Sequence, residues 1–274
     1  MSVKFRRSLL LAAGALLAVT AVAVPVVVST ASAQNVVTGS GNQPRIVGGN
    51  QASLAEHPYA VFLEDTGGNQ YCGAVIVSSV AVATAAHCAK ALPRTQVRVV
   101  AGRQDKRTDD GDVLAVSRIW ISNTFRDPTQ GDDVAVMTVR GQFSYRPVKL
   151  PDSGDAGLYA PNTEATVLGW GRVADGGDRS DYLRSGVVPV VSDADCKADY
   201  SIYDAKSMVC AGYAQGGVDA CQGDSGGPLV VGDTLIGLVS FGDGCGRPGK
   251  PGVYTRVSSY ADQIAEEAQP RIFG

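Results

Sequence analysis

Short apolar runs rich in valine, isoleucine and threonine recur from residue 59 to residue 257 of this 274-residue chain, separated by glycine and aspartate. Such runs are typical of β-strands, and the turn residues at their ends keep each strand short. No helical pattern alternates with them, which disfavours a parallel sheet of β-α-β units. The runs fall into two sets on either side of the Pro-rich segment 146–162. We therefore expect an all-β fold in two similar halves, as barrels or a sandwich.

One helix is expected, near the carboxyl end, in the stretch SSYADQIAEEA. Ser258 or Ser259 supplies a candidate cap, and Tyr260, Ile264 and Ala265 give it an apolar face. The 33 glycines and 13 prolines fit a chain of short strands joined by many turns. The net charge is −3, with no basic patch that contains aromatic residues, so nucleic acid is not an expected partner.

The amino terminus has the features of an export signal. A basic start, an apolar run and the small residues STASA predict a signal peptide over 1–33. The apolar run is nearly long enough for a membrane anchor, but Pro25 and the A-x-A ending favour cleavage. The Arg6–Arg7 pair leaves general secretion and twin-arginine export both open. Residues 34–45 then form a pro-segment, and we expect the mature chain to be extracellular and free of the membrane.

Six cysteines follow the predicted signal peptide. An even number in an exported chain predicts disulfides, and the absence of a C-x-x-C pair disfavours a zinc site. Spacing alone leaves fifteen pairings open.

The stretch DACQGDSGGP places Ser225 in a G-x-S-x-G pattern. The nucleophile elbow of α/β-hydrolases has this pattern, but its histidine follows the serine in the chain. Here both histidines, His57 and His87, precede Ser225. The chain order histidine, aspartate, serine remains, with His87 in TAAHC and Asp133 in GDDVAVM. A serine hydroxyl needs a neutral imidazole as base, and a carboxylate holds that imidazole in one tautomer.

Seven segments together resemble the trypsin-like serine proteases of the chymotrypsin superfamily, most closely the secreted trypsins of actinomycetes. The resemblance runs from Ile46 to about Ala268, through RIVGG, TAAHC, DDVAV, GWG, DACQGDSGGPLV, LVSFGDGCGRPGKPGVYTRV and the closing helix. It implies a peptidase domain over 46–274. The implied fold is two six-stranded antiparallel β-barrels, about 46–150 and 160–260, with a C-terminal α-helix and the active site between the barrels.

The resemblance also implies the catalytic roles. His87 is the general base, Asp133 rather than the adjacent Asp132 orients it, and Ser225 is the nucleophile. The amides of Gly223 and Ser225 form the oxyanion hole. Ser240 is implied to hydrogen-bond the triad acid at the edge of the substrate-binding site, whereas His57 matches no catalytic position.

Substrate choice is implied to rest on Asp219, at the base of a pocket for the residue before the cut bond. A carboxylate there favours arginine or lysine, and Gly242 and Gly252 leave the pocket walls open. Ala220 stands where many trypsins carry a serine that helps to hold lysine. We therefore expect a stronger preference for arginine, whose fork reaches Asp219 unaided.

Activation is implied by the segment around Arg45. Cleavage between Arg45 and Ile46 frees an α-ammonium, which pairs with the buried carboxylate of Asp224 and orders the oxyanion loop. The uncut chain is then nearly inactive, and Arg45 itself is a site for self-activation.

The resemblance selects the disulfides Cys72–Cys88, Cys196–Cys210 and Cys221–Cys245. No cofactor or metal is expected, because Arg103 occupies the place of a glutamate ligand in calcium-binding trypsins. Asp109, Asp110 and Asp112 offer only a weak ion site. The expected partners are protein or peptide substrates and proteinaceous inhibitors, and we expect a monomer. Two other functions stay open, a catalytically inactive homologue that acts as a binding module and an esterase on another fold.

Overall fold

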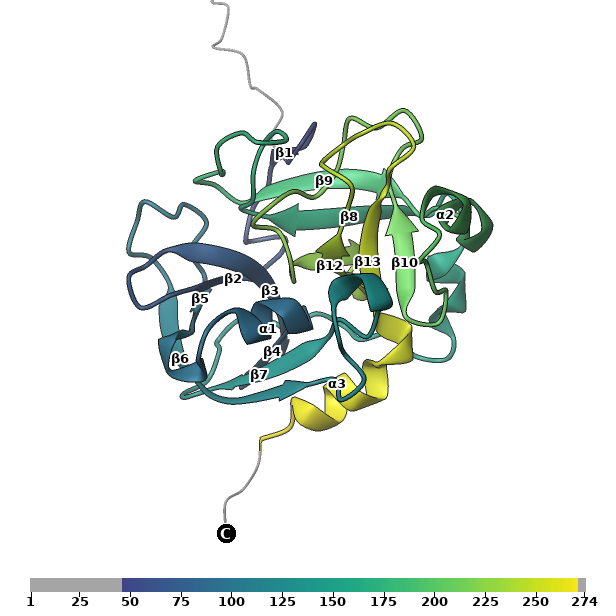
Figure 1. Ribbon diagram of the computed structural model, residues 1–274. Helices are drawn as coiled ribbons and strands as arrows, with labels where there is room; N and C mark the ends of the chain where they lie inside the picture. Colours follow the sequence, from purple (N-terminus) through teal and green to yellow (C-terminus); the bar gives the residue numbers. More distant parts are fainter. Residues whose placement is uncertain (1–45, 271–274) are drawn as a thin grey trace, which may run out of the picture. The chain divides into compact units, whose positions relative to one another are not determined.

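The computed structural model describes residues 46–270, and the signal peptide, the pro-segment and Arg45 lie outside them. A closed antiparallel barrel of six strands forms the first half, in the order β2-β3-β4-β7-β6-β5 (Figure 1). Its buried side chains are mostly valine and alanine, which are small enough for six short strands to close around them. The strands are β2 (Ala60–Glu64), β3 (Gln70–Ser78), β4 (Ala81–Thr84), β5 (Arg98–Ala101), β6 (Asp112–Ile121) and β7 (Ala135–Val139).

A seven-stranded antiparallel sheet forms the second half, in the order β1-β9-β8-β11-β12-β13-β10. Hydrogen bonds from Gly212 N to Pro189 O and from Val191 N to Cys210 O also join β10 to the end of β9. The strands are β1 (Asn50–Gln51), β8 (Glu164–Gly169), β9 (Arg184–Pro189), β10 (Met208–Ala211), β11 (Pro228–Val231), β12 (Thr234–Phe241) and β13 (Gly252–Arg256).

The start of the described chain belongs to the second sheet, which corrects the predicted boundary of the first barrel at residue 46. Strand β1 pairs with β9, and Val47 forms a bridge with Asp219. The side chain of Ile46 is buried in the apolar cluster of the second sheet. This burial explains why the segment leaves the first barrel, and β1 is the seventh strand of a sheet for which six were expected.

The C-terminal helix α3 (Ala261–Glu267) packs back on the first half, beside β7 (Figure 1). Ile264 in the helix and the flanking Tyr260 and Ala268 are buried and join the barrel's apolar cluster. The predicted serine caps are wrong, because a 3₁₀ turn at Val257–Ser259 precedes the helix and Tyr260 is the N-cap residue. The hydroxyl of Ser259 donates instead to the carbonyl of Lys206.

Five short helical segments were not predicted. They are the helices α1 (Ala86–Ala91) and α2 (Asp193–Asp199) and the 3₁₀ helices Arg94–Gln96, Pro128–Gln130 and Asp155–Tyr159. Two of them begin with a side-chain cap, in which Ser192 accepts from Asp195 N and Asp127 accepts from Thr129 N.

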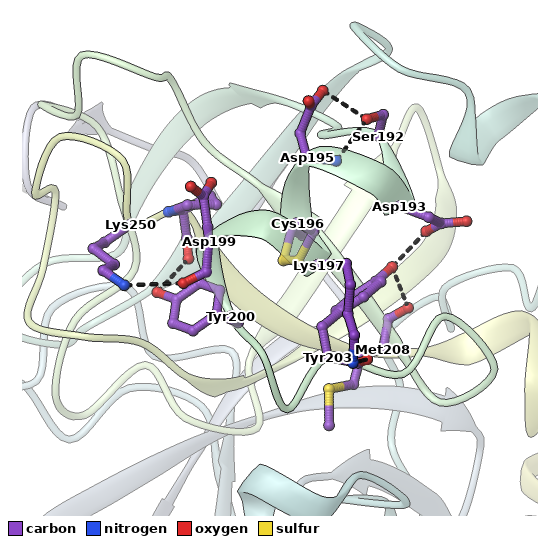
Figure 2. The surroundings of a disulfide bond; sticks show 12 residues. Ser192, Asp193, Asp195, Cys196, Lys197, Asp199, Tyr200, Tyr203, Met208 and Lys250 are labelled. Atoms are coloured by element: carbon purple, nitrogen blue, oxygen red, sulfur yellow. Dashed lines mark hydrogen bonds between the residues drawn. A yellow bond between two sulfur atoms is a disulfide. The ribbon is translucent and has the colours of Figure 1, made fainter.

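Helix α2 supports the segment after β12 (Figure 2). The disulfide Cys196–Cys210 ties α2 to β10, and the hydroxyl of Tyr200 donates to the carbonyl of Pro251 at 3.0 Å. The Tyr200 ring packs edge-on against Phe241, with centroids 5.9 Å apart, and Lys250 lies over its face. These contacts fix the loop that joins β12 to β13.

The three disulfides of the described residues are Cys72–Cys88, Cys196–Cys210 and Cys221–Cys245, the pairs that the resemblance implied. Each closes a loop of 14 to 24 residues, and loops of this size contribute about 3 kcal/mol in a chain-entropy account. Within 46–270, no helix is both long enough and apolar enough to cross a membrane.

Candidate active site

The carboxylate of Asp133 holds His87 through two hydrogen bonds. Helix α1 has no capping side chain of its own. Instead Asp133 Oδ1 accepts from the backbone amide of His87 at 2.9 Å, in the first turn of α1. The other oxygen, Oδ2, lies 2.8 Å from His87 Nδ1. One carboxylate therefore caps the helix and orients the imidazole that the helix carries.

Asp133 is itself fixed from the second sheet. Its side chain is 1% exposed, Ser240 Oγ donates to Oδ2 at 2.6 Å, and Thr255 Oγ1 donates to its carbonyl oxygen at 2.6 Å. The adjacent Asp132 turns away, with φ at 55°, and accepts a hydrogen bond from Tyr260. The structure therefore places Asp133, and not Asp132, against His87.

Ser225 lies beside His87 where the two halves meet. Strand β3 passes the serine, and Gly73 N donates to Ser225 O at 2.8 Å. The sulfur of Cys88 lies 3.4 Å from Ser225 O and 3.5 Å from His87 Nε2. Cys88, bonded to β3 through Cys72, thus lies between the Ser225 backbone and the imidazole of His87.

Gly223 begins the turn that carries Ser225. Its φ is +103°, a conformation that residues with a side chain rarely adopt. Its carbonyl accepts from Gln70 Nε2 at 2.8 Å, and Gln70 Oε1 accepts from Lys106 Nζ at 3.0 Å. Because an ammonium group only donates, Lys106 forces the glutamine to turn its amide nitrogen toward Gly223. This link fixes the carbonyl of Gly223, at the start of the turn that carries Ser225.

Asp224 is fully buried behind the nucleophile. Its Oδ1 accepts from Gly171 N at 2.7 Å and its Oδ2 from Cys221 N at 3.0 Å. Burial raises the pKa of Asp224 to about 6, against the lowering effect of these two amides and of the charges on Lys106 and Arg179. A Cβ at Gly169 would lie 2.0 Å from Asp224 Oδ1, and one at Gly171 would lie 2.5 Å from its Cγ. The GWG motif thus makes room for this carboxylate.

Ile46 lies next to the same loop. It is 1% exposed and packs in the cluster that contains Ala220. Asp219 N donates to Val47 O at 3.1 Å, which ties the segment after Ile46 to the loop between Asp219 and Asp224.

A pocket of about 210 Å³ opens below Ser225, lined by second-half residues only. Asp219 lies in it, 3% exposed, and its Oδ2 accepts from Gly246 N at 2.8 Å. Its Oδ1 is buried and has no hydrogen-bond partner among the described residues. Burial raises the pKa of Asp219 to about 7. A buried carboxylate oxygen without a partner is costly, so the pocket favours a cation that reaches Oδ1.

The predicted wall residues line this pocket, namely Ala220, Ser240, Gly242 and Gly252. A Cβ at Gly252 would lie 2.7 Å from Asp219 Oδ1 and would block access to that oxygen. The disulfide Cys221–Cys245 joins two sides of the pocket. Ser240 both lines the pocket and donates to Asp133.

Cation binding to Asp219 should depend on pH. The raised pKa, about 7, means that the empty pocket takes up a proton as the pH falls through neutrality. A neutral carboxyl loses its attraction for a cation, so the affinity for an aromatic amidine should fall by up to about tenfold per pH unit below 7. Calorimetric titration between pH 5.5 and 8.5 measures this slope, with Asp219→Asn as a control that should lack it. Equal affinity across the range in the unsubstituted protein would contradict the assignment.

Two residues were predicted to have no part in the site, His57 as a catalytic group and Arg103 as a metal ligand. His57 Nδ1 lies 3.1 Å from the hydroxyl of Tyr59, and burial lowers the His57 pKa. Arg103 Nε donates to the carbonyl of Asp110 at 2.8 Å, so the guanidinium occupies the loop that also carries Asp109 and Asp112.

The sequence prediction missed several supporting residues, namely Gln70, Lys106, Gly169, Gly171, Arg179, Tyr200 and Thr255. Each contacts or makes room for a site residue that is distant in sequence; Gln70, for example, donates to the carbonyl of Gly223. The GWG motif was the one signal present for any of them, and its physical reason appears only when Asp224 is placed beside it.

Comparison with known proteins gives one consistent family. The family model described as Trypsin matches residues 46–264. A trypsin of Saccharopolyspora erythraea is 45% identical over 81% of this chain and 97% of its own length. Trypsin-1 of Astacus astacus is 38% identical over 81% of this chain and 100% of its own. Trypsin 5G1 of Aedes aegypti is also 38% identical, over 81% of this chain and 84% of its own length.

Proposed function

Because the chain belongs to the trypsin family of serine endopeptidases, we propose that it cleaves proteins and peptides after arginine, and less readily after lysine, with Ser225, His87 and Asp133 as its triad. The observation that carries the proposal is the position of Asp219. Its unpartnered carboxylate oxygen lies in the pocket that Ser225 also lines.

Acylation begins when Ser225 Oγ attacks the carbonyl carbon of the bond to be cut. His87 Nε2 takes the hydroxyl proton, and the negative charge forms on the carbonyl oxygen, where the amides of Gly223 and Ser225 donate to it. The tetrahedral intermediate collapses as His87 gives its proton to the leaving amine. Water then attacks the acyl-enzyme, with the same base, and releases the acid and Ser225.

Asp133 fixes the tautomer in this cycle. It accepts at His87 Nδ1, so Nε2 has a free lone pair toward Ser225. It also stabilises the imidazolium while His87 holds the proton. The three donors around its carboxylate hold it in place.

The preference for arginine is proposed to follow from Ala220. Alanine has no hydroxyl that could accept a hydrogen bond from the ammonium group of a substrate lysine. The lysine side chain is also shorter than that of arginine, so its charge lies farther from Asp219. Ala220→Ser should therefore raise kcat/KM for lysine substrates and lower the arginine-to-lysine ratio by about three- to tenfold, the net effect of one ordinary hydrogen bond. Matched arginine and lysine anilides measure the ratio. An unchanged ratio in the variant would contradict this role for Ala220.

Activation is proposed to require cleavage at Arg45–Ile46. The new α-ammonium of Ile46 would compensate the buried charge of Asp224, whose pKa burial raises. The proposal is supported by the burial of Ile46 beside the loop that carries Asp224. Arg45 fits the enzyme's own specificity, so the chain is proposed to activate itself.

The proposed setting is extracellular, after removal of residues 1–33, and rests on the amino-terminal sequence. The proposed partners are protein substrates and proteinaceous inhibitors of the active site, with no membrane and no nucleic acid involved. The enzyme is proposed to work as a monomer, without a cofactor.

A fluorophosphonate probe tests the proposed function. It should label Ser225 rapidly after cleavage at Arg45 and slowly, if at all, before it. Peptide mapping identifies the labelled serine. The alternative, an inactive homologue that acts as a binding module, requires that the cleaved chain resist labelling, and that result would overturn the proposal.

A further inference from the structure

A second pocket, of about 680 Å³, is lined mostly by residues of the first half and lies near the turn that begins at Gly223. It lies between the turn from β2 to β3, the loop from β5 to β6, and Arg179. Four of its lining residues are cationic and two are acidic, namely Arg103, Lys106, Arg107 and Arg179 against Glu64 and Asp109.

Two of the four cations contact neutral oxygens. Lys106 Nζ donates to Gln70 Oε1 at 3.0 Å and to Trp170 O at 3.5 Å. Arg179 donates to the carbonyl of Gln70. Burial, together with the neighbouring charge of Arg179, lowers the pKa of Lys106 to about 8. A partly buried ammonium beside a guanidinium is stabilised when an anion approaches.

The other two cations, Arg107 and Arg103, each have a partner in the neighbouring loops. Arg107 pairs with Asp105 at 2.8 Å and lies 3.8 Å from Asp181, at an exposed position. Arg103 donates to the backbone carbonyl of Asp110. Burial raises the pKa of Glu64, and the charge of Arg103 opposes that rise more than any other charge does. The pocket therefore has a cationic side around Lys106 and Arg179.

This pocket adjoins the turn that carries Ser225, through Gln70. The pocket that contains Asp219 (the specificity pocket) and the pocket that contains Lys106 and Arg179 (the cationic pocket) share no lining residue. The leaving amine takes its proton from His87, which is in the first half. Beyond it, strand β3 runs past Ser225 at Gly73 and begins at Gln70, which lines the cationic pocket and contacts Gly223. An extended peptide advances about 3.3 Å per residue, so a few residues reach from the cut bond to this pocket.

We infer that the cationic pocket binds an acidic side chain of the substrate, from the second to the fourth residue after the cut bond. The inference rests on the proposed function, because it names the class of substrate that the same site prefers. Lys106 and Arg179 are the primary contacts, and Arg103 adds charge.

Matched quenched peptides test the inference. Each contains one arginine, and the second, third or fourth residue after it is glutamate, glutamine or lysine. At one position or more, kcat/KM should be about three- to tenfold higher for glutamate than for glutamine, and lowest for lysine, as expected for partly exposed charge pairs. The preference should shrink as sodium chloride rises from 0.05 to 0.5 M.

Charge reversal locates the effect. In the double variant Arg103→Glu, Arg179→Glu the glutamate-to-lysine ratio should invert. The ratio is measured within each variant, so a general loss of activity does not affect it. Arg140→Glu, at an exposed position outside the pocket, is the matched control and should keep the unsubstituted ratio.

An arginine anilide, which has no residue after the cut bond, separates the two claims. If the protein hydrolyses the anilide and treats glutamate and glutamine alike at all three positions, the pocket inference is wrong and the proposed function stands. A ratio that the double variant leaves unchanged also overturns the inference. If neither the anilide nor any peptide is cut, both claims fail.

Discussion

Asp133→Asn should lower kcat by about 10⁴-fold, the loss that this exchange causes in a related serine protease. The amide has one acceptor oxygen in place of two. If that oxygen keeps the bond to the His87 backbone amide, the NH₂ group replaces Oδ2 and faces His87 Nδ1 and Ser240. Nδ1 must then accept, Nε2 carries the proton, and Ser225 has no base.

Asp132→Asn is the matched control, because the two acids are adjacent and differ in their partners. Asp132 accepts from Tyr260, and its loss should change kcat by less than about threefold. Single-turnover rates on an arginine ester measure the chemical step separately from substrate binding. Neither aspartate lines the pocket below Ser225, so KM should change little in either variant. Equal losses in both variants would show that the carboxylate orienting His87 has been misassigned.

Asp219→Asn should lower kcat/KM for arginine substrates by about 30- to 3000-fold, the range for loss of one partner of a buried charge pair. The isosteric amide keeps the shape of the pocket and removes the charge that a guanidinium needs at Oδ1. Substrates with an uncharged residue before the cut bond should lose much less, so the variant should show a flatter specificity profile.

Asp243→Asn controls for long-range charge. Asp243 is exposed, lies in the same loop as the pocket wall and pairs with Arg247 at 3.3 Å. Its replacement should change kcat/KM by less than about twofold, since exposed pairs contribute little. A comparable loss in Asp243→Asn would mean that arginine is selected by the overall field and not by contact with Asp219.

The all-β class was predictable from the sequence because short Val-, Ile- and Thr-rich runs with Gly and Asp breaks have few alternatives. The candidate triad was proposed from the sequence for a different reason. With only two histidines, both ahead of Ser225, the chain order excluded the nucleophile elbow. The pocket acid came from the resemblance, and the structure added the reason, a buried oxygen without a partner.

The features that sequence reasoning missed depend on contacts between distant segments. Nothing near Ile46 indicates that it packs with the second sheet, since its partners lie more than a hundred residues away. The serine caps failed because the preceding residues form a 3₁₀ turn, which local propensity did not reveal. The S-x-x-D pattern at Ser192 was available as a cap signal and was overlooked. The link from Lys106 through Gln70 to Gly223 joins three segments and has no local signature.

The most direct test of the central claim is the cleavage profile of the processed protein. The chain is cut at Arg45–Ile46, incubated with a diverse pool of peptides, and the new carboxyl termini are identified by mass spectrometry. The account predicts that nearly all new termini are arginine or lysine, with arginine in excess, and that Ser225→Ala produces none. Cleavage after uncharged residues, or equal cleavage by Ser225→Ala, would contradict it.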